Sequence, residues 1–265
     1  MKKQLNLSNA CICGNGIVGR ATAKLFGITA LYDILPSLST VALKDLKQYE
    51  YIFICLPTPT IEGKCQTKPI SDLIETIEGG WHYTDRDLPT YIIRSTVPPG
   101  TADQLMKDLD MDRIISNPEF LSQDTWEEDI EKPFVIVVGG KNYSNLGKVR
   151  NLYRLRYGGH VQMVSTNNVT AEMIKYTLNC LFSSKVIFAN AIYDIAERMG
   201  GDYNAIKATL DACPYAGANH WDVWYKGRRG VYGRCLPKDL EAFANWTLDD
   251  LFLFLLQASR RIDKR

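Results

Sequence analysis

The sequence of 265 residues contains no C-x-x-C pair, and its seven cysteines are scattered and odd in number. This pattern argues against a disulfide framework and against a zinc site. We therefore expect no metal, and we expect a reducing, cytoplasmic location. The basic N-terminus is followed by only a short apolar run before a glycine motif, which is not the pattern of a signal peptide.

An excess of charge of one sign is also missing, since the formal net charge at pH 7 is +1. This balance gives no electrostatic reason to expect a nucleic acid or an anionic membrane as a partner. Long hydrophobic runs are absent as well, because the longest, residues 251–256, is far too short to cross a bilayer. What remains is the composition of an ordinary globular protein, with 46% hydrophobic and 23% charged residues.

A glycine motif near the N-terminus predicts a dinucleotide site. Residues 10–13 are typical of a buried strand, Gly14-Asn15-Gly16-Ile17-Val18-Gly19 follows, and residues 20–26 favour a helix. The first glycine makes the turn, the second lets a pyrophosphate approach the backbone, and the third lets the helix pack on the strand. A second predicted strand ends at Asp33, which is placed to hold a ribose 2′-OH and favours NAD. A glycine-rich turn without a ligand is the alternative.

Strand and helix patterns continue to alternate up to residue 165, which predicts an α/β fold with a Rossmann-like, doubly wound parallel sheet. Further strands are expected at residues 51–56, 91–94, 114–115, 134–139 and 161–164, with helices at 71–78, 101–109 and 145–155. The loops Pro57–Thr60, Ser95–Thr101 and Asn117–Gln123 follow strands and should converge on one edge of the sheet. Ligands of open α/β sheets bind at that edge. We assign residues 1–165 to an NAD-binding domain.

Residues 166–265 are mostly helical in pattern and are expected to form a domain for substrate binding and dimerisation. Asn168 or Thr170 should cap a long helix that runs to about Met199. Lys175 and Asn179 lie four residues apart and therefore share one face of it. A lysine in a buried helix needs a partner or a ligand, although a solvated polar stripe is the alternative.

A single cysteine stands in the turn Gly230-Val231-Tyr232-Gly233-Arg234-Cys235-Leu236-Pro237-Lys238-Asp239. Pro237 suits the first position of a helix, so Cys235 should lie just before the helix, near backbone donors and the positive end of its dipole. Lys238 adds a cation. These conditions lower the pKa of a thiol and favour a nucleophile, whereas a small buried cysteine beside a turn is the alternative.

Taken together, these segments resemble the UDP-glucose/GDP-mannose 6-dehydrogenase family. The likeness rests on the glycine motif, the Lys175/Asn179 helix, the cysteine turn and three further motifs, which are Leu56-Pro57-Thr58-Pro59, Ser95-Thr96-Val97-Pro98-Pro99-Gly100-Thr101 and Asn117-Pro118-Glu119-Phe120-Leu121. The family oxidises a sugar C6 alcohol to a carboxylate with two NAD, through a thioester on the cysteine. The resemblance is strongest to the enzymes that act on UDP-glucose.

The resemblance implies a role for each matching residue. Cys235 would be the nucleophile, Lys175 and Asn179 would stabilise oxyanions, Asp239 with Thr96 would hold and activate the water, and Glu119 would be an acid or base. Lys238 would support the thiolate and the substrate. Cofactor contacts would come from Gly14, Gly16, Ile17, Val18, Gly19, Asp33, Pro57, Thr58, Ser95, Thr96 and Lys238. Substrate contacts would come from Glu119, Phe120, Leu121, Lys175, Asn179, Gly233 and Cys235.

The chain also departs from the family pattern. Gln123 stands where the family usually has glutamate, and the sequence ends where a second α/β domain, which closes over the nucleotide, would begin. We therefore expect a short form that lacks the UDP-binding domain and pairs as a homodimer through the long helix. Two other interpretations stay open: a single-step NAD-dependent hydroxy-acid dehydrogenase, and a non-catalytic NAD-binding dimer.

Overall fold

The computed structural model describes residues 5–79 and 88–262. Residues 1–4 and 263–265, the outer ends of the two expected domains, lie outside the described residues. The chain forms two compact units, one of Met1–Thr58 with Gln66–Lys175 and one of Pro59–Cys65 with Tyr176–Arg265. The first unit thus extends ten residues beyond the boundary expected at residue 165, and a short internal segment belongs to the second.

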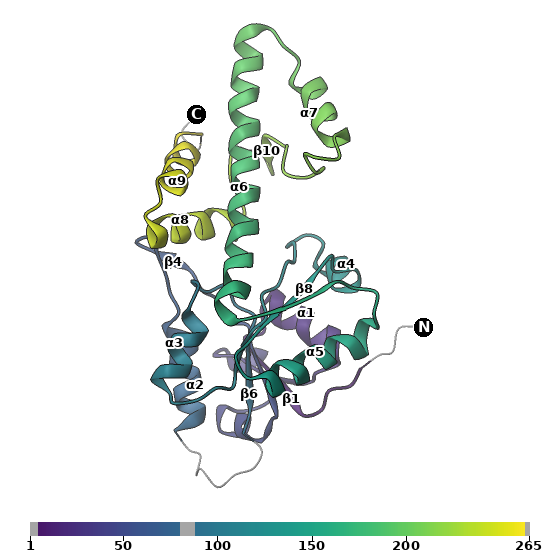
Figure 1. The fold of residues 1–265 in the computed structure, drawn as a ribbon, viewed down its shortest axis with the longest axis vertical. Helices are drawn as coiled ribbons and strands as arrows, with labels where there is room; N and C mark the ends of the chain where they lie inside the picture. Colours follow the sequence, from purple (N-terminus) through teal and green to yellow (C-terminus); the bar gives the residue numbers. More distant parts are fainter. Residues whose placement is uncertain (1–4, 80–87, 263–265) are drawn as a thin grey trace. The chain divides into compact units, whose positions relative to one another are not determined.

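The first unit is built around one sheet, as the alternation of strand and helix patterns predicted (Figure 1). Among the described residues, seven strands pair in the order β2-β1-β3-β6-β7-β8-β9, and every pairing is parallel except that of β7 with β8. The strands are β1 Ala10–Cys13, β2 Ala30–Tyr32, β3 Tyr51–Ile54, β6 Thr90–Ile93, β7 Ile114–Ser116, β8 Ile136–Gly139 and β9 Met163–Thr166. The predicted α/β fold class is therefore confirmed.

Helices cover both faces of this sheet, because its strands are apolar on both sides. Side chains of α1 (Ile17–Phe26) and α5 (Tyr143–Tyr157) pack into the core on one face. Side chains of α2 (Lys68–Glu78) and α3 (Thr101–Asp108) pack into the core on the other face. The carboxyl ends of the parallel strands are left to the loops that carry the predicted site residues.

Several local elements differ from the sequence-based expectations. The short acidic helix α4 (Trp126–Glu131) and the 3-10 turns Pro36–Leu38 and Leu43–Gln48 have too little apolar periodicity to be predicted. The extended loop expected at residues 57–60 leads into a hairpin of β4 (Thr60–Ile61) and β5 (Lys64–Cys65).

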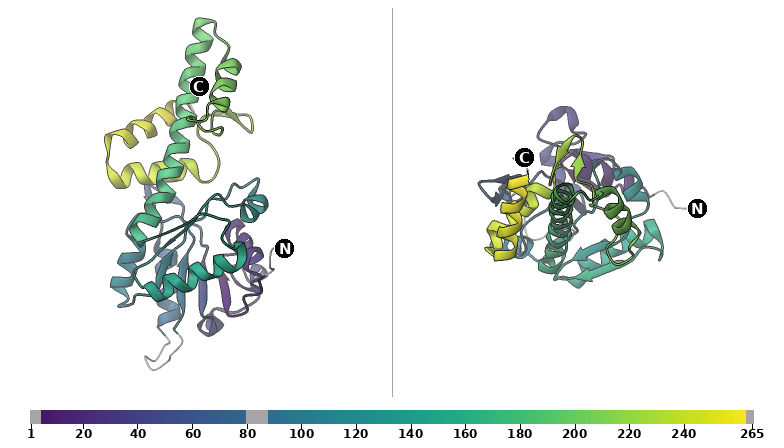
Figure 2. Two further views of the ribbon diagram at one scale, coloured as in Figure 1. Left: turned by 45° about the vertical axis from the view of Figure 1, so that its right-hand side comes forward. Right: turned by 90° about the horizontal axis from the view of Figure 1, so that it is seen from above.

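The second unit is organised along α6 (Asn168–Met199), the long helix of Figure 2, which belongs to this unit from Tyr176 onward. Helices α8 (Leu236–Thr247) and α9 (Asp250–Ile262) pack in one apolar cluster with α6. A second cluster joins α6 to α7 (Tyr203–Ala212) and to the segment before the hairpin of β10 (Trp224–Tyr225) and β11 (Arg228–Arg229). No helix in the described part of the chain combines the length and apolar character needed to cross a membrane.

The start of α6 corrects one prediction. The capping side chain is Asn167, whose Oδ1 accepts a hydrogen bond of 2.8 Å from the N–H of Thr170, so the expectation that Thr170 itself is the cap is wrong. Asn168, which we expected as a cap, is instead fully buried and accepts from the N–H of Ser116 at 3.0 Å. It also donates to Asp103 at 3.0 Å, and so it ties α6 to the end of β7 and to α3.

Candidate functional site

The three glycines of the N-terminal motif meet the three steric demands of a dinucleotide turn. Gly14 has φ +97°, and a Cβ there would lie 2.6 Å from the carbonyl oxygen of Cys55. A Cβ on Gly19 would lie 1.9 Å from the carbonyl oxygen of Gly14, so only glycine lets α1 pack this closely. Gly16 has nothing within 4 Å of its Cβ position, which leaves the backbone open to a ligand.

The N-terminus of α1 and Asp33 complete the features expected of an NAD site. Gly16 precedes α1 and offers no side-chain cap, so the first N–H groups of the helix remain suited to an anion. The Asp33 carboxylate accepts from the N–H of Asn15 at 2.8 Å, which fixes it beside the turn. The residues present therefore fit NAD, while contacts by Ile17 and Val18, both half-buried, stay predictions.

Two of the predicted loops are held together at the edge of the sheet. The Thr58 hydroxyl donates to the carbonyl of Thr96 at 2.7 Å, and the Ser95 hydroxyl donates to the carbonyl of Leu56 at 2.7 Å. Thr58 is buried, whereas Pro57 beside it is exposed. The expected convergence of these two loops is therefore observed.

Lys175 has the partner that its burial required. Its ammonium group donates to the backbone carbonyl of Glu119 at 2.7 Å and to the Glu119 carboxylate at 3.2 Å. The two side chains are only 6% and 9% exposed, so this is a buried ion pair. The interpretation of Lys175 as part of a solvated stripe is wrong.

The segment after Glu119 is also engaged within the first unit. The N–H of Leu121 donates to the Glu119 carboxylate at 2.6 Å, so the backbone donor expected to contact substrate is occupied in this structure. The ring of Phe120 lies 5.5 Å from the Lys175 nitrogen and 5.4 Å from the ring of Phe134. These contacts fix the backbone path of the Asn117–Leu121 segment.

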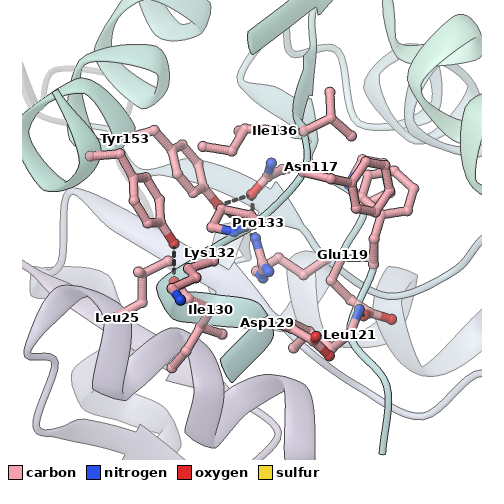
Figure 3. A pocket seen from close by; sticks show the side chains of 16 residues that line it. Leu25, Asn117, Glu119, Leu121, Asp129, Ile130, Lys132, Pro133, Ile136 and Tyr153 are labelled. Atoms are coloured by element: carbon pink, nitrogen blue, oxygen red, sulfur yellow. Dashed lines mark hydrogen bonds between the residues drawn. The ribbon is translucent and has the colours of Figure 1, made fainter. Parts of the chain in front are cut away.

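A pocket of about 70 Å³ adjoins this segment, and Figure 3 shows Asn117, Glu119, Leu121 and Tyr153 around it. Arg94, which also lines it, is 6% exposed and donates through Nη1 to Asn117 and to the Tyr153 hydroxyl, each at 2.6 Å. Its Nε has no partner among the described residues. Sequence reasoning missed this polar cluster, although an arginine at the end of an apolar strand was a usable signal.

Glu172 was also missed, although it lies one turn before Lys175 on α6. It is 3% exposed, and its carboxylate accepts from the N–H of Gly100 at 2.6 Å, from the N–H of Ala102 at 3.0 Å and from the Ser116 hydroxyl at 2.9 Å. Burial raises the pKa of Glu172 to about 7, against the opposing effect of these three donors.

In the second unit, the buried side chains of Asn179 and Asp239 form a polar group with the half-buried Lys238. Asp239 is 1% exposed, and one carboxylate oxygen accepts from the Asn179 amide at 2.6 Å while the other accepts from the Lys238 ammonium group. Lys238 also accepts, through its backbone carbonyl, a 2.8 Å hydrogen bond from Thr60. The structure thus directs the Lys238 charge to its neighbour Asp239, and its expected support of a thiolate and of the cofactor stays a prediction.

Cys235 occupies the position predicted for it, directly before α8, and its side chain is exposed. Gly230 and Gly233 have φ values of +101° and +98°, which explains the glycines on both sides of the turn. Pro237 is the second residue of α8, since Leu236 already belongs to the helix; the first position predicted for it is wrong by one residue. The interpretation of Cys235 as a small buried cysteine is also wrong.

Comparison with known proteins gives matches along most of the chain. The NAD binding domain of the UDP-glucose/GDP-mannose dehydrogenase family matches residues 36–156, and the central domain of that family matches residues 169–265. A UDP-glucose 6-dehydrogenase of Rickettsia typhi is 29% identical over 206 residues, which are 76% of this chain and 46% of that protein. The chain thus spans about half the length of such relatives.

Solved structures agree at the level of the fold. A UDP-glucose dehydrogenase of Pyrobaculum islandicum superimposes with a TM-score of 0.81 at 21% identity, over 96% of this chain and 67% of that one. A UDP-D-ManNAc dehydrogenase of Pyrococcus horikoshii gives 0.80 at 21% identity, over 96% and 68%. Since the two family matches cover more than half of the chain, in the order cofactor domain then central domain, the chain belongs to the UDP-glucose/GDP-mannose dehydrogenase family, whose members are NAD-dependent nucleotide-sugar dehydrogenases.

Proposed function

We propose that this chain is a nucleotide-sugar 6-dehydrogenase that oxidises UDP-glucose to UDP-glucuronate in two steps. The observation that carries the proposal is the exposed thiol of Cys235 directly before α8, with the buried, hydrogen-bonded Asp239 one turn further on. Backbone N–H groups at the start of a helix favour negative charge, which suits a thiolate nucleophile. A second oxidation at the same carbon needs a nucleophile that is also a good leaving group, and a thiolate is both.

The first oxidation removes a hydride from C6 of the sugar and a proton from its hydroxyl, which leaves an aldehyde. When bound at the Gly14–Gly19 turn, NAD supplies the hydride acceptor, one molecule for each oxidation. Lys175 and Asn179 lie one turn apart on α6 and carry the hydrogen-bond donors for the oxygen that becomes negative. In this structure both donors are engaged by carboxylates, Glu119 and Asp239, which keeps them oriented.

The second oxidation uses Cys235 covalently. Its sulfur forms a bond to the aldehyde carbon, and the former carbonyl oxygen takes up a proton to give a thiohemiacetal. Loss of a second hydride and of that proton gives a thioester. Water then adds to the thioester carbon, the carbon–sulfur bond breaks, and the carboxylate leaves with the thiolate restored. Asp239 takes a proton from this water, Thr96 orients the water, and Glu119 serves as an acid or base in the same step.

The proposal includes a homodimer formed through α6. Leu181, Phe188 and Ile195 are 51%, 53% and 46% exposed, and they recur every seven residues on one face of the helix. An apolar stripe at this spacing is suited to packing against a second helix of the same kind. A second copy of the chain is the proposed occupant of this stripe.

The test is an assay of the purified chain with NAD and each of three nucleotide sugars: UDP-glucose, UDP-ManNAc and GDP-mannose. We expect turnover with UDP-glucose and a product identified as UDP-glucuronate by mass spectrometry. Turnover with only one of the other two sugars would keep the reaction and change the substrate. Oxidation of a small hydroxy acid instead, or NAD binding without turnover on any substrate, would refute the proposal.

A further inference from the structure

The Glu172 carboxylate connects three separate segments of the first unit. It accepts hydrogen bonds from the N–H groups of Gly100 and Ala102, at the end of the Ser95–Thr101 loop, and from the Ser116 hydroxyl, at the end of β7. Because Glu172 lies on α6, a single side chain ties that helix to two loops at the edge of the sheet. Its partners are 56 to 72 residues away in sequence.

The contact with Gly100 and Ala102 places the carboxylate at the N-terminus of α3. Gly100, which precedes α3, has φ +92° and offers no side chain that could cap the helix. Glu172 therefore supplies from another element the negative group that the start of a helix favours. The position of the loop before α3 is thus set by α6.

Glu172 also lies beside two residues to which we assign roles in the reaction. Thr96, Lys175 and Glu172 line one small cavity of about 10 Å³. At the Thr96 end of the Ser95–Thr101 loop, Thr58 donates to the carbonyl of Thr96, which ties Thr96 to the neighbouring loop and not to α6. Glu172 is therefore the contact that fixes the far end of the loop relative to Lys175.

We propose that Glu172 is a positioning residue that fixes the position of Thr96 relative to Lys175. This inference rests on the function proposed above, in which Thr96 orients the attacking water and Lys175 binds the reacting oxygen. An error of about 1 Å in the placement of such groups costs roughly a hundredfold in rate. A buried carboxylate with three hydrogen bonds is stiff enough to prevent that error, because each lost hydrogen bond would leave a buried donor unpaired.

The titration of Glu172 provides a readout. Burial raises its pKa to about 7, the three donors oppose this effect, and the nearby Asp103 adds to it. Lys175 lines the same cavity and is the cation nearest in sequence on α6. The ionised carboxylate accepts all three hydrogen bonds more strongly than the neutral acid does, so we expect kcat to fall as the pH drops through about 7.

The experiment compares Glu172→Gln and Glu172→Asp with the wild-type chain, and uses Glu78→Gln as a matched control. Glu78 is also a largely buried carboxylate of the first unit, and it pairs with Arg113 at 2.7 Å. The proposed reaction assigns no function to Glu78. We expect Glu172→Gln to lower kcat about a hundredfold with little change in KM for NAD, and to abolish the decline in kcat near pH 7. Glu172→Asp, which keeps the charge, should recover part of the rate, whereas Glu78→Gln should lower only the melting temperature.

The inference is overturned if the wild-type chain turns over a nucleotide sugar and Glu172→Gln keeps the wild-type kcat and pH profile. It is also overturned if Glu172→Gln lowers kcat no more than Glu78→Gln does. If the wild type turns over no nucleotide sugar, the proposed function fails, and hydrogen exchange then tests the positioning role by itself. Faster exchange at the amides of residues 95–97 in Glu172→Gln than in Glu78→Gln would support it. Equal exchange in the two variants would refute it.

Discussion

The Lys175 ammonium group donates to two oxygens of Glu119, the backbone carbonyl at 2.7 Å and the carboxylate at 3.2 Å. The pair is almost sealed from water, with side-chain exposures of 6% and 9%. A buried ion pair contributes little net stability when intact, but loss of one partner leaves an uncompensated buried charge. The pair therefore couples the α6 helix to the Asn117–Leu121 segment.

A double-mutant cycle tests this coupling. We expect Lys175→Met and Glu119→Gln each to lower the free energy of unfolding by about 3–5 kcal/mol, because each strands a buried polar partner. The double variant should lose less than the sum of the two, by about 1–3 kcal/mol. The exposed pair Lys68 and Asp72 is the control and should couple by only about 0.5 kcal/mol in the same urea titrations. Additivity of the buried pair would contradict the account.

Two glycines of the same turn should respond differently to alanine. Gly16 has φ −78° and open space at its Cβ position, so Gly16→Ala should leave the melting temperature unchanged and weaken NAD binding by about tenfold or more. Gly19→Ala should destabilise the fold, because its Cβ would lie 1.9 Å from the carbonyl oxygen of Gly14. Calorimetric titration with NAD and thermal unfolding separate the two effects. An unchanged NAD affinity in Gly16→Ala would place the cofactor elsewhere.

The raised pKa of Glu172 makes stability depend on pH. The folded value of about 7 lies above the ordinary value of 4.5, so the ionised form is disfavoured by folding. The contribution of this group to stability is therefore fully present below about pH 4.5 and is lost as the pH rises to about 7. The loss is on the order of 3 kcal/mol. The difference in free energy of unfolding between wild type and Glu172→Gln should follow this curve, and a flat difference between pH 4.5 and 8 would contradict it.

The proposed dimer can be tested on its apolar stripe. Replacing both Leu181 and Phe188 with glutamate should convert a dimer into a monomer, because two charges would be buried in the interface. A matched single variant on α7, Ala205→Glu, replaces an exposed residue and should leave the dimer intact. Light scattering during gel filtration gives the mass of each. A wild-type chain that is already monomeric at micromolar concentration would refute the proposal.

The features that could be predicted from the sequence are those that local chemistry determines. The Gly14–Gly19 turn, the apolar strands and the proline after Cys235 each carry their own steric signal, and the structure has a turn, a mostly parallel sheet and a helix start at these places. For Lys175 the sequence left two interpretations open, a partnered buried lysine and a solvated polar stripe, and its burial in the structure decides for the first.

The identity of the partners could not be predicted in this way. Glu172 reaches donors 56 to 72 residues away, so only the fold brings them together. Two neighbouring asparagines, Asn167 and Asn168, could each cap α6. In the structure Asn168 is hydrogen-bonded to Ser116 and Asp103 in the interior, so Asn167 is the cap. The α4 helix lacks an apolar stripe. It buries Ile130, whose backbone carbonyl accepts a hydrogen bond from the Tyr157 hydroxyl at 2.5 Å.

The most direct test of the central claim is the number of NADH molecules formed per molecule of UDP-glucose consumed, measured on the purified chain beside Cys235→Ser. The account predicts two NADH per sugar for the wild type, because both oxidations occur before the thioester is hydrolysed. It predicts that Cys235→Ser forms no carboxylate, since the serine oxygen is a poor nucleophile and leaving group here. One NADH per sugar, or two from the serine variant at the wild-type rate, would contradict a thioester on Cys235.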